Sequence, residues 1–309
     1  MGKTGLRRSP APAMAARMTE SGNATRSGLI LGIGAYALWG LLPLYLRLLR
    51  GVPSLEVLAH RIVWSLLLLV AIVAVTRQAG AIRAAARGRT LALLAASATL
   101  IAINWLVYIW AVQHGHVLEA SLGYFINPLV NVALGMALLG ETIGRVQKAA
   151  VAVAAVGVAV MALSGGGALW ISLTLALSFG GYGLIRKVAA IDSLGGLTVE
   201  TALLLAPALA VIVLAHGSGQ GAFGQDRTID LLLVLAGVVT AVPLLMFAAA
   251  ARRLRYATMG LLQYIAPTLQ FVEAVMLFHE PLRPVHVVTF ALIWTGCALY
   301  AWGGWRRAG

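Results

Sequence analysis

The 309-residue sequence has few charged side chains, and acidic ones are scarcest, with 10 Asp and Glu against 23 Lys and Arg. Charged residues make up 11% of the chain, whereas soluble domains contain about 25%. A soluble fold of this length could not cover its surface with so few charges. Apolar residues make up 61% and fall into runs long enough to cross a hydrocarbon layer about 30 Å thick. The composition excludes a soluble enzyme, a nucleic-acid-binding domain and a disordered chain, and it predicts an integral membrane protein.

Cysteine and nucleotide-binding motifs are also scarce. The chain has one cysteine, so it cannot form an intrachain disulfide. This residue, Cys297, lies in an apolar run. No phosphate-binding loop with its lysine is present, so we expect neither ATP-driven pumping nor a bound cofactor. The segment His114-Gly115-His116, followed by Glu119, lacks the spacing of a metal site, so we expect no metal.

Apolar runs between polar, glycine or proline breaks indicate ten membrane-spanning helices. We therefore predict an all-α integral membrane protein, preceded by a basic cytoplasmic tail over residues 1–28 that lacks regular structure. The ten expected spans cover residues 29–46, 57–75, 90–112, 117–139, 146–163, 168–186, 199–215, 230–250, 258–278 and 285–304.

The positive charges indicate how these spans are oriented. When the N-terminus is placed in the cytoplasm, 18 of the 23 lysine and arginine residues lie on the cytoplasmic side and 5 lie on the other face. Cytoplasmic loops of membrane proteins carry an excess of such residues. The distribution predicts cytoplasmic N- and C-termini, and it explains the net charge of +13 without a nucleic-acid partner.

A sequence pattern recurs at a fixed spacing. Pro128 and Pro267 are 139 residues apart, and so are Glu141 and Glu280. Five spans in each copy is an odd number, so the second copy enters the membrane from the opposite side and the repeat is inverted. Inverted repeats are typical of secondary transporters, in which the substrate binds near the bilayer midplane between the halves. The pattern predicts two five-helix repeats, residues 29–163 and 168–305.

Two segments of the first half resemble a known family. Residues 104–112 read NWLVYIWAV and residues 118–129 read LEASLGYFINPL, and both are similar to the RarD family of the EamA-type drug/metabolite transporter superfamily. The resemblance covers about residues 29–305. It implies ten helices in two inverted bundles around a central cavity. It also implies secondary transport, usually export, of small metabolites or drugs across the bacterial plasma (inner) membrane. Weaker similarities are AYALWG at 35–40, HRIVWS at 60–65, and the Gly-Glu and His-Glu pairs at 140–141 and 279–280.

Polar side chains of the fourth and ninth spans are the first candidates for a substrate site, because each costs free energy in lipid and usually faces a bundle interior. In the fourth span they recur every three or four residues, so they share one face of a helix. Pro128 and Pro267 each leave a backbone carbonyl free, which predicts two equivalent polar notches. The alternative is that these side chains only join helices by hydrogen bonds. The candidates are Tyr124, Asn127, Asn131, Gln263, Tyr264 and Gln270.

Aromatic residues of the first and third spans are further candidates for the substrate site. Flat aromatic walls bind amphipathic or cationic ligands through packing and cation–π contacts. The alternative is an aromatic belt at the membrane interface. The candidates are Tyr36, Trp39, Trp105 and Tyr108, together with the amide of Asn104.

Few ionisable residues lie within the spans. Glu119 lies near the outer end of the fourth span, and His60 and Arg61 lie near the outer start of the second. An ion pair between these helices would form either an outer gate or a structural link. Glu273, in the ninth span, has no counterpart in the first half. We expect it to couple transport to a proton or cation, unless its carboxylate reaches the membrane surface.

The acidic residues of the repeat have a structural interpretation. Glu141 and Glu280 each follow a span and stand at the entrance of a loop. Carboxylates at such places accept hydrogen bonds from the free amides of a helix start. We therefore expect each to cap the helix that follows it.

These observations favour a secondary transporter whose two halves rock about a central site for a small molecule, with a proton or cation as coupling ion. The alternative is a membrane-embedded enzyme acting on a lipid or polyprenyl substrate, which needs clustered carboxylates, a metal site or a nucleophile–base pair. The acids of this sequence are scattered over different spans, so we predict that the protein is not an enzyme. A channel is also disfavoured, because no filter motif is visible.

Overall fold

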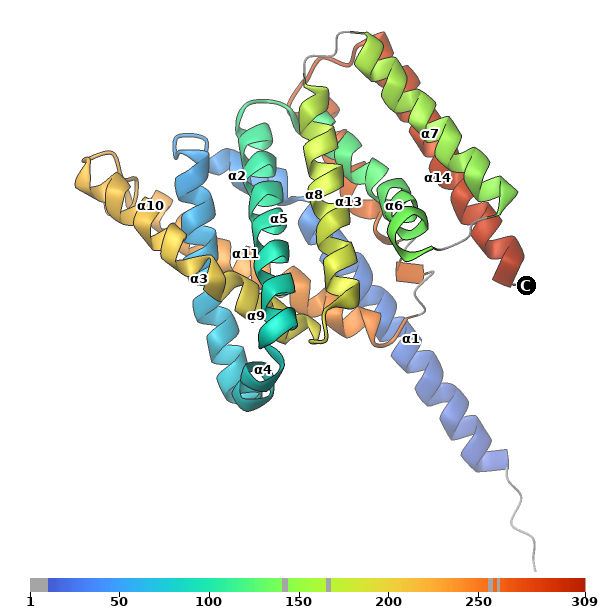
Figure 1. The fold of residues 1–309 in the computed structure, drawn as a ribbon, viewed down its shortest axis with the longest axis horizontal. Helices are drawn as coiled ribbons and strands as arrows, with labels where there is room; N and C mark the ends of the chain where they lie inside the picture. Colours follow the sequence, from blue (N-terminus) through green and yellow to red (C-terminus); the bar gives the residue numbers. More distant parts are fainter. Residues whose placement is uncertain (1–10, 141–143, 165–167, 255–257, 260–261, 309) are drawn as a thin grey trace, which may run out of the picture.

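The computed structural model describes residues 11–140, 144–164, 168–254, 258–259 and 262–308. Regular structure in these residues is entirely helical (Figure 1), which confirms the all-α prediction for this part of the chain. The elements are α1 (Ala11–Gly40), α2 (Leu42–Leu48), α3 (Ser54–Val75), α4 (Ala79–Ala85), α5 (Gly88–Gln113), α6 (Val117–Leu139), α7 (Arg145–Leu163), α8 (Leu169–Val188), α9 (Ser193–Leu203), α10 (Leu205–Gly217), α11 (Arg227–Ala251), α13 (Ile265–Val272), the π-helix η1 (Glu273–Leu277) and α14 (Pro284–Ala308).

Several of these helices are long and apolar enough to cross a membrane. In the part of the chain that the structure describes there are seven, and α9 with α10, bent by 42° at their junction, adds an eighth if the pair forms one span. Two shorter apolar helices, Ile265–Leu277 and Pro284–Tyr300, lie where the ninth and tenth spans are expected. Length and composition therefore support a multi-pass membrane protein, and the count of ten crossings stays a prediction. The seven are Thr25–Leu48, α3, α5, Val117–Leu138 of α6, α7, α8 and α11.

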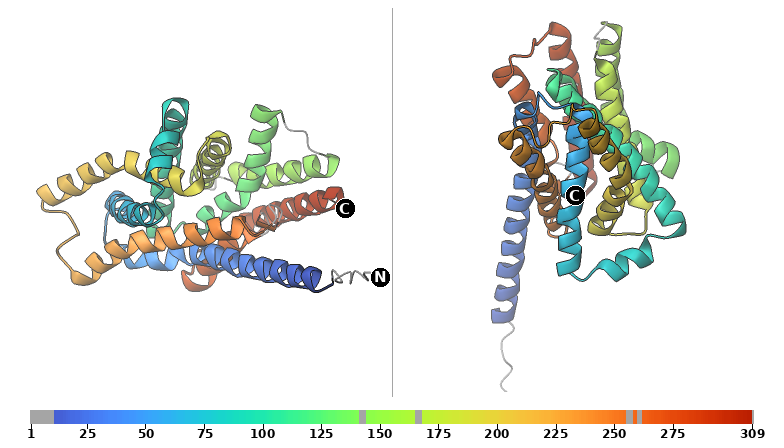
Figure 2. Two further views of the ribbon diagram at one scale, coloured as in Figure 1. Left: turned by 90° about the horizontal axis from the view of Figure 1, so that it is seen from below. Right: turned by 90° about the vertical axis from the view of Figure 1, so that its left-hand side faces the viewer.

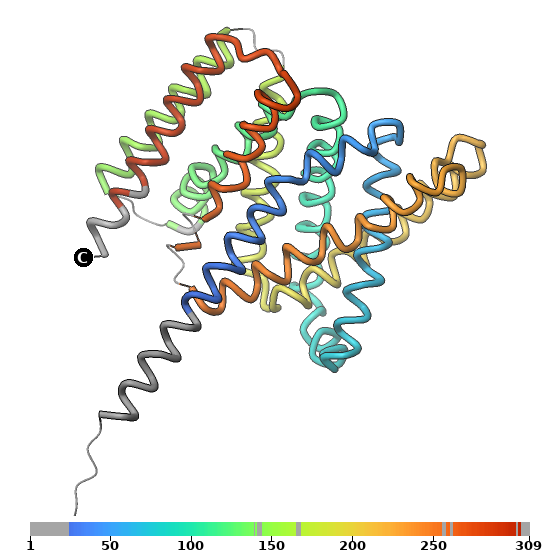
Figure 3. Tube along the Cα trace, turned by 180° about the vertical axis from the view of Figure 1, so that it is seen from behind, coloured from blue at the N-terminus to red at the C-terminus, as the bar shows by residue number. Residues whose placement is uncertain are grey.

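Helices from the two halves of the sequence pack against each other. At one end of the molecule α7 lies along α14, and at the other α3 packs on α10 (Figure 1, Figure 3). Between these ends α6 packs on α8 and α13, and α5 packs on α8. α1 runs beside α11 (Figure 2). Each pair joins residues 29–163 to residues 168–305, so much of the core is an interface between the two halves.

Matching backbone turns follow the fourth and ninth apolar runs. Gly140, at the end of α6, has φ 66°, and His279, just after η1, has φ 53°. The two residues are 139 positions apart, which is the spacing of the prolines. Glycine adopts this left-handed conformation freely, whereas a residue with a Cβ is strained by about 1–2 kcal/mol. The turn keeps its shape in the second half although His279 replaces glycine.

Aspartates begin two helices of the second half. The Asp192 carboxylate accepts a hydrogen bond from the Gly195 amide (2.9 Å) at the start of α9. Asp226 accepts hydrogen bonds from the Thr228 (2.7 Å) and Ile229 (3.0 Å) amides at the start of α11. The backbone hydrogen bonds from Ile229 and Thr228 lower the pKa of the Asp226 carboxyl. Such caps satisfy free amides and set where each helix begins.

The ninth apolar run differs from the sequence-based expectation. α13 begins at Ile265, and η1 follows from Glu273. Pro267 therefore lies in the first turn of α13, where its missing amide breaks no helical hydrogen bond. Pro128 lies inside α6, so the expectation of two equivalent proline notches is wrong. At the other end of the chain, α1 begins at Ala11, within the tail expected to lack regular structure.

Candidate functional site

Four of the predicted residues meet at the interface between the halves and are called here the central polar cluster. They are Asn104 and Tyr108 on α5, Tyr124 on α6 and Gln270 on α13. The Tyr124 hydroxyl donates a hydrogen bond to Asn104 Oδ1 (3.1 Å), and Gln270 Nε2 donates one to the Tyr108 hydroxyl (2.9 Å). The centroids of the two tyrosine rings lie 5.5 Å apart. The cluster thereby joins two helices of the first half to one of the second.

Helix α8 supports the central polar cluster from one side. Asn104 Nδ2 donates hydrogen bonds to the Leu175 carbonyl (3.0 Å) and the Ser178 hydroxyl (3.1 Å) of α8. Gly123 on α6 allows α8 to come this close, because a Cβ there would lie 2.8 Å from the Ser172 carbonyl oxygen. A contact of this kind between helix backbones requires glycine.

Helices α1 and α6 hold α13 in place. Gln270 Nε2 also donates a hydrogen bond to the Trp39 carbonyl of α1 (3.2 Å). The Ser121 hydroxyl of α6 donates one to the Pro267 carbonyl of α13 (2.8 Å). Ser121 and Gln270 are both buried, so these hydrogen bonds form in a region of low dielectric, where they are stronger than in water.

The predicted aromatic residues divide between two places. Trp105 lies beside Arg61 of α3, whose guanidinium carbon is 4.5 Å from the centroid of the Trp105 ring. Tyr36 and Trp39 form an aromatic group with Phe247 of α11, with ring centroids 5.5 to 6.0 Å apart. Trp39 therefore reaches the central polar cluster through its backbone carbonyl, while its ring packs between α1 and α11.

Several buried polar atoms on α3, α6, α13 and η1 have no hydrogen-bond partner among the residues that the structure describes. Buried polar groups in proteins almost always have one, and each unpaired group costs about 1–3 kcal/mol. Such atoms mark places where a ligand, an ion or a proton can bind. They include Arg61 Nη1, Asn127 Oδ1, Gln270 Oε1 and both carboxylate oxygens of Glu273.

Three residues predicted for the same site lie apart from the central polar cluster. Asn131 is exposed and lies toward α8, where its Oδ1 would be 3.4 Å from a Cβ at Gly180. Tyr264 stacks on Phe125 with ring centroids 6.1 Å apart, and Gln263 beside it is half-buried. Spacing along a helix predicts a shared face, but it does not predict which neighbouring helix each side chain meets.

The ionisable residues expected at an outer gate have separate partners. Glu119 pairs with His116, the residue that precedes α6 (3.6 Å), and lines an open pocket of about 410 Å³. Arg61 Nε donates a hydrogen bond to the Thr240 hydroxyl of α11 (2.8 Å). His60 lies 3.9 Å from a glutamate one turn earlier in α3. Among the described residues no ion pair joins Glu119 to Arg61 or His60, so the expected contact between the second and fourth spans is not formed.

Glu280 caps a helix, but not the helix that follows it. Its carboxylate oxygens accept hydrogen bonds from the amides of Val117 (2.9 Å) and Leu118 (2.8 Å) at the start of α6. Burial raises the pKa of the Glu280 carboxyl, and the hydrogen bonds from these two amides act against this shift. The sequence predicted correctly that Glu280 caps a helix, but it predicted the wrong helix. The contact joins residues that are distant in the sequence, so no local pattern indicates it. Its counterpart Glu141 lies outside the described residues.

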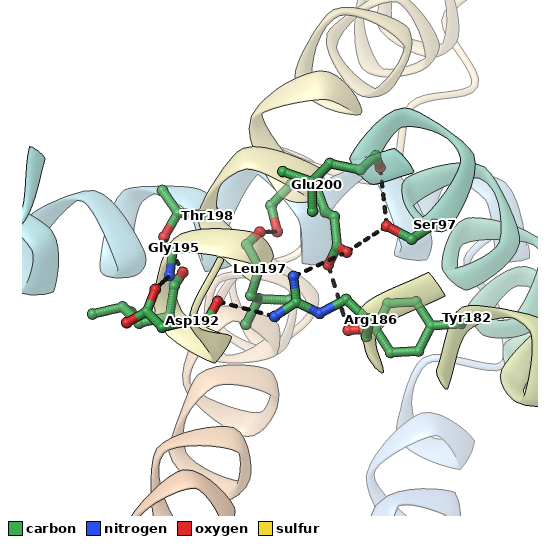
Figure 4. A network of polar contacts seen from close by, with 11 residues as sticks. Ser97, Tyr182, Arg186, Asp192, Gly195, Leu197, Thr198 and Glu200 are labelled. Carbon is green, nitrogen blue, oxygen red and sulfur yellow. Dashed lines mark hydrogen bonds and ion pairs between the residues drawn. The ribbon is translucent and has the colours of Figure 1, made fainter. Parts of the chain in front are cut away.

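A second polar group, called here the Glu200 cluster, joins α5, α8 and α9 (Figure 4). Glu200 on α9 accepts a hydrogen bond from the Ser97 hydroxyl of α5 (2.5 Å). It also accepts one from the Tyr182 hydroxyl of α8 (3.4 Å) and lies 3.7 Å from Nη1 of Arg186. Glu200 is 1% exposed, so a carboxylate is held inside the helix bundle by groups of both halves.

The Glu200 cluster was not predicted from the sequence. The signal was available, because Glu200 is an acid within the apolar run 199–215 and Arg186 ends the run 168–186. An acid and a base near the same end of two consecutive spans can pair across the bundle. Their contact with Ser97 depends on how α5 packs and could not be read from spacing.

Comparison with known proteins finds similarity over most of the chain. Residues 26–163 match the EamA-like transporter family. An uncharacterised transporter of Pseudomonas aeruginosa is 47% identical over 91% of this chain and 95% of its own length. The RarD proteins of Streptomyces exfoliatus and Escherichia coli are each 44% identical, over 93% and 89% of this chain and 91% and 94% of their own. A solved crystal structure that is 18% identical has a TM-score of 0.58, covering 89% of this chain and 97% of its own, and so shows a shared fold.

Proposed function

This chain belongs to the RarD family of EamA-type drug/metabolite transporters, and we propose that it is a secondary transporter that exports a small molecule from the bacterial cytoplasm by alternating access. The family and the apolar helices make it a multi-pass membrane protein that transports small molecules. Relatives in Bacillus subtilis and Vibrio cholerae are also named transporters, which favours transport over a membrane-embedded enzyme. Export is the usual direction in the family.

Alternating access here is a rocking motion of two inverted halves. In the two repeats, spans one to five correspond to spans six to ten. The contact of the first span with the eighth (α1 with α11) therefore corresponds to the contact of the sixth with the third (α8 with α5), and both are present. In the same way, the contact of the fourth span with the sixth (α6 with α8) corresponds to that of the ninth with the first (α13 with α1), and both are present. Contacts that recur between corresponding helices of the two halves are expected of repeats related by a twofold axis. Such repeats place the substrate near the midplane between the halves.

The substrate binds at the central polar cluster. The observation that carries this proposal is that hydrogen bonds between the halves occur there beside unpaired buried atoms. Gln270 Nε2 donates hydrogen bonds to the Tyr108 hydroxyl and the Trp39 carbonyl, while Gln270 Oε1 has no partner among the described residues. A ligand that donates a hydrogen bond to this oxygen removes a cost of about 1–3 kcal/mol. It would also contact the helices that must move, which is how a ligand biases one state over another.

Polar contacts between the halves lie on both sides of the central polar cluster. The Ser97–Glu200 contact lies seven residues before Asn104 along α5, and the Glu280 contact at Val117 lies seven residues before Tyr124 along α6. Seven residues are roughly 10 Å of helix, and α5 and α6 run in opposite directions. The two contacts therefore flank the site, one toward each face of the membrane. In alternating access each opens while the other stays closed.

Glu273 is the coupling residue in this proposal. Glu273 is 3% exposed, and among the described residues neither of its carboxylate oxygens has a hydrogen-bond partner, so the carboxylate is enclosed by the protein. An isolated ionised carboxylate inside a protein costs several kcal/mol. The group is therefore stable there with a proton or a cation bound, and release of that ion toward one face would drive the rocking motion.

Binding and flux measurements on one variant test this proposal. The detergent-purified protein is screened for ligands that raise its melting temperature, since a ligand that binds only the folded state stabilises it by mass action. Ligands found in this way are then followed as flux in proteoliposomes. Tyr124→Ala is expected to abolish both stabilisation and flux while the protein still accumulates in the membrane. Leu138→Ala, which truncates an exposed side chain near the other end of α6, is the control and should behave like the wild type. Unchanged flux in Tyr124→Ala would remove the central polar cluster from the transport site.

A further inference from the structure

Arg61 is a buried cation at a fixed position beside the central polar cluster. Arg61 is 6% exposed. Nε donates a hydrogen bond to the Thr240 hydroxyl of α11 (2.8 Å), and the guanidinium group lies over the Trp105 ring of α5, 4.5 Å from the centroid. Contacts with two other helices therefore hold the group in one orientation. Such a rigid planar group is suited to bind a ligand without rearrangement.

The charge of Arg61 is not balanced by a carboxylate in the part of the chain that the structure describes. The ion pairs found there involve other groups. The nearest acid on its own helix, Glu56, uses one carboxylate oxygen to accept a hydrogen bond from the Ala222 amide (2.8 Å). Within the described part of the chain, Arg61 Nη1 is buried and has no hydrogen-bond partner. A buried arginine without a counter-ion costs several kcal/mol, and an anion is the ligand that offsets this cost.

The surroundings of Arg61 indicate the rest of the ligand. The hydroxyl groups of Tyr45, Tyr108 and Tyr124 are close enough to interact with it electrostatically. The Tyr45 and Tyr124 hydroxyls donate their protons to the Leu232 carbonyl (2.7 Å) and to Asn104 Oδ1 (3.1 Å). The Tyr108 hydroxyl accepts a hydrogen bond from Gln270 Nε2 (2.9 Å), so its own proton can be donated to an oxygen acceptor of a ligand. The Trp105 face offers a flat apolar surface. A hydroxyl donor, a guanidinium group and an aromatic wall together fit a carboxylate attached to a planar apolar body.

We propose that Arg61 binds the carboxylate of the transported molecule, so that the substrate is a small organic acid with an aromatic or otherwise flat body. This inference rests on the proposed function, because it assigns the chemical class of the ligand to the same site. Guanidinium–carboxylate pairs form charge-assisted hydrogen bonds that are stronger than neutral ones. The amide of the same acid has no negative charge and would leave Arg61 unbalanced.

Matched acid and amide probes test this inference. Benzoate is compared with benzamide, and indole-3-acetate with indole-3-acetamide, by their effect on the melting temperature of the full-length protein in detergent at millimolar concentration. The acids are expected to stabilise the wild type, with affinities at least about tenfold above those of the amides. Arg61→Gln should abolish this preference, and Arg61→Lys should retain part of it. Arg283→Gln, which removes an exposed arginine, is the control and should leave the preference unchanged.

Two further readouts separate ligand binding from a structural role. Without ligand, Arg61→Gln is expected to be no less stable than the wild type, because it removes an unbalanced buried charge; a large loss of stability in both Arg61 variants would contradict this. Acids that bind no better than amides, or no stabilisation by either acid, would overturn the inference. A neutral ligand that is lost in Tyr124→Ala but unaffected by Arg61→Gln would also overturn it, while leaving the proposed transport site standing.

Discussion

Replacing Glu280 with alanine removes the contact that joins the loop after η1 to the start of α6. Val117 and Leu118, whose amides donate to this carboxylate, are 0% and 2% exposed. Water cannot easily replace the lost acceptor at such buried positions. Each unsatisfied amide costs about 1–3 kcal/mol, so two cost about 2–6 kcal/mol in the free energy of unfolding. For a chain of this size we expect the melting temperature to fall by roughly 5 °C or more.

Thermal unfolding of the purified protein in one detergent measures this effect. Glu119→Ala is the matched control, because it also removes a carboxylate at the start of α6. The partner of this carboxylate is His116, whose side chain is 35% exposed. A partly exposed ion pair contributes about 0–1 kcal/mol. Glu280→Gln keeps one acceptor oxygen in place of two, so one of the two amides loses its partner and the effect should be intermediate. A Glu280→Ala variant that is no less stable than Glu119→Ala would refute the capping role of Glu280.

The pH dependence of the same contact provides a second check. Burial raises the pKa of Glu280 in the folded state, so the folded protein holds this proton more tightly than the unfolded chain. The resulting stabilisation is complete below the unfolded pKa, about 4.3, and is lost as the pH rises through the folded pKa. The stability difference between the wild type and Glu280→Gln should therefore be larger near pH 4 than at neutral pH. A difference that instead grew toward neutral pH would contradict the assigned direction of the shift.

Three further predictions concern packing, coupling and capping. A Cβ at Gly237 would lie 2.7 Å from the backbone of Trp64, so Gly237→Ala should destabilise the protein by about 1–3 kcal/mol. Gly51→Ala is the control and should not destabilise it, because a Cβ there would meet no described atom within 4 Å. Equal melting temperatures of the two variants would be inconsistent with the α3–α11 contact. Glu273→Gln should make flux in proteoliposomes independent of a pH gradient, and a wild-type response would exclude it as the coupling residue. Hydrogen bonds lower the pKa of Asp226, so the stability lost in Asp226→Ala should be full at neutral pH and disappear as the pH falls through the folded pKa; a loss independent of pH would argue against this cap.

Much of the central polar cluster could be predicted because its residues are exceptions to their surroundings. Asn104, Tyr108, Tyr124 and Gln270 are polar groups in apolar runs, and such groups turn away from lipid whatever the fold. Asn131 met the same criterion but is exposed. The criterion identifies residues that avoid lipid in general, and it does not identify the helix that each one meets.

The contacts of charged groups could not be predicted in the same way. Glu280 caps α6, 163 residues earlier in the chain, and Arg61 contacts Thr240, 179 residues later. No local pattern encodes contacts of this length. The Glu200 cluster shows the same limit, because the acid is visible in the sequence and its Ser97 partner is not.

The membrane location and the helical fold follow from the amino-acid sequence alone, because the transfer of an apolar run into lipid depends on that run alone. The family follows from the sequence as well, since the motifs that carry the resemblance are short and local. Three features are visible only in the folded protein: which polar atoms meet, which helix each carboxylate caps, and the tyrosine-rich surroundings of Arg61, which has no carboxylate partner in the described residues. These outcomes depend on how helices from the two halves pack, which is settled by the whole interface between them and not by any one segment.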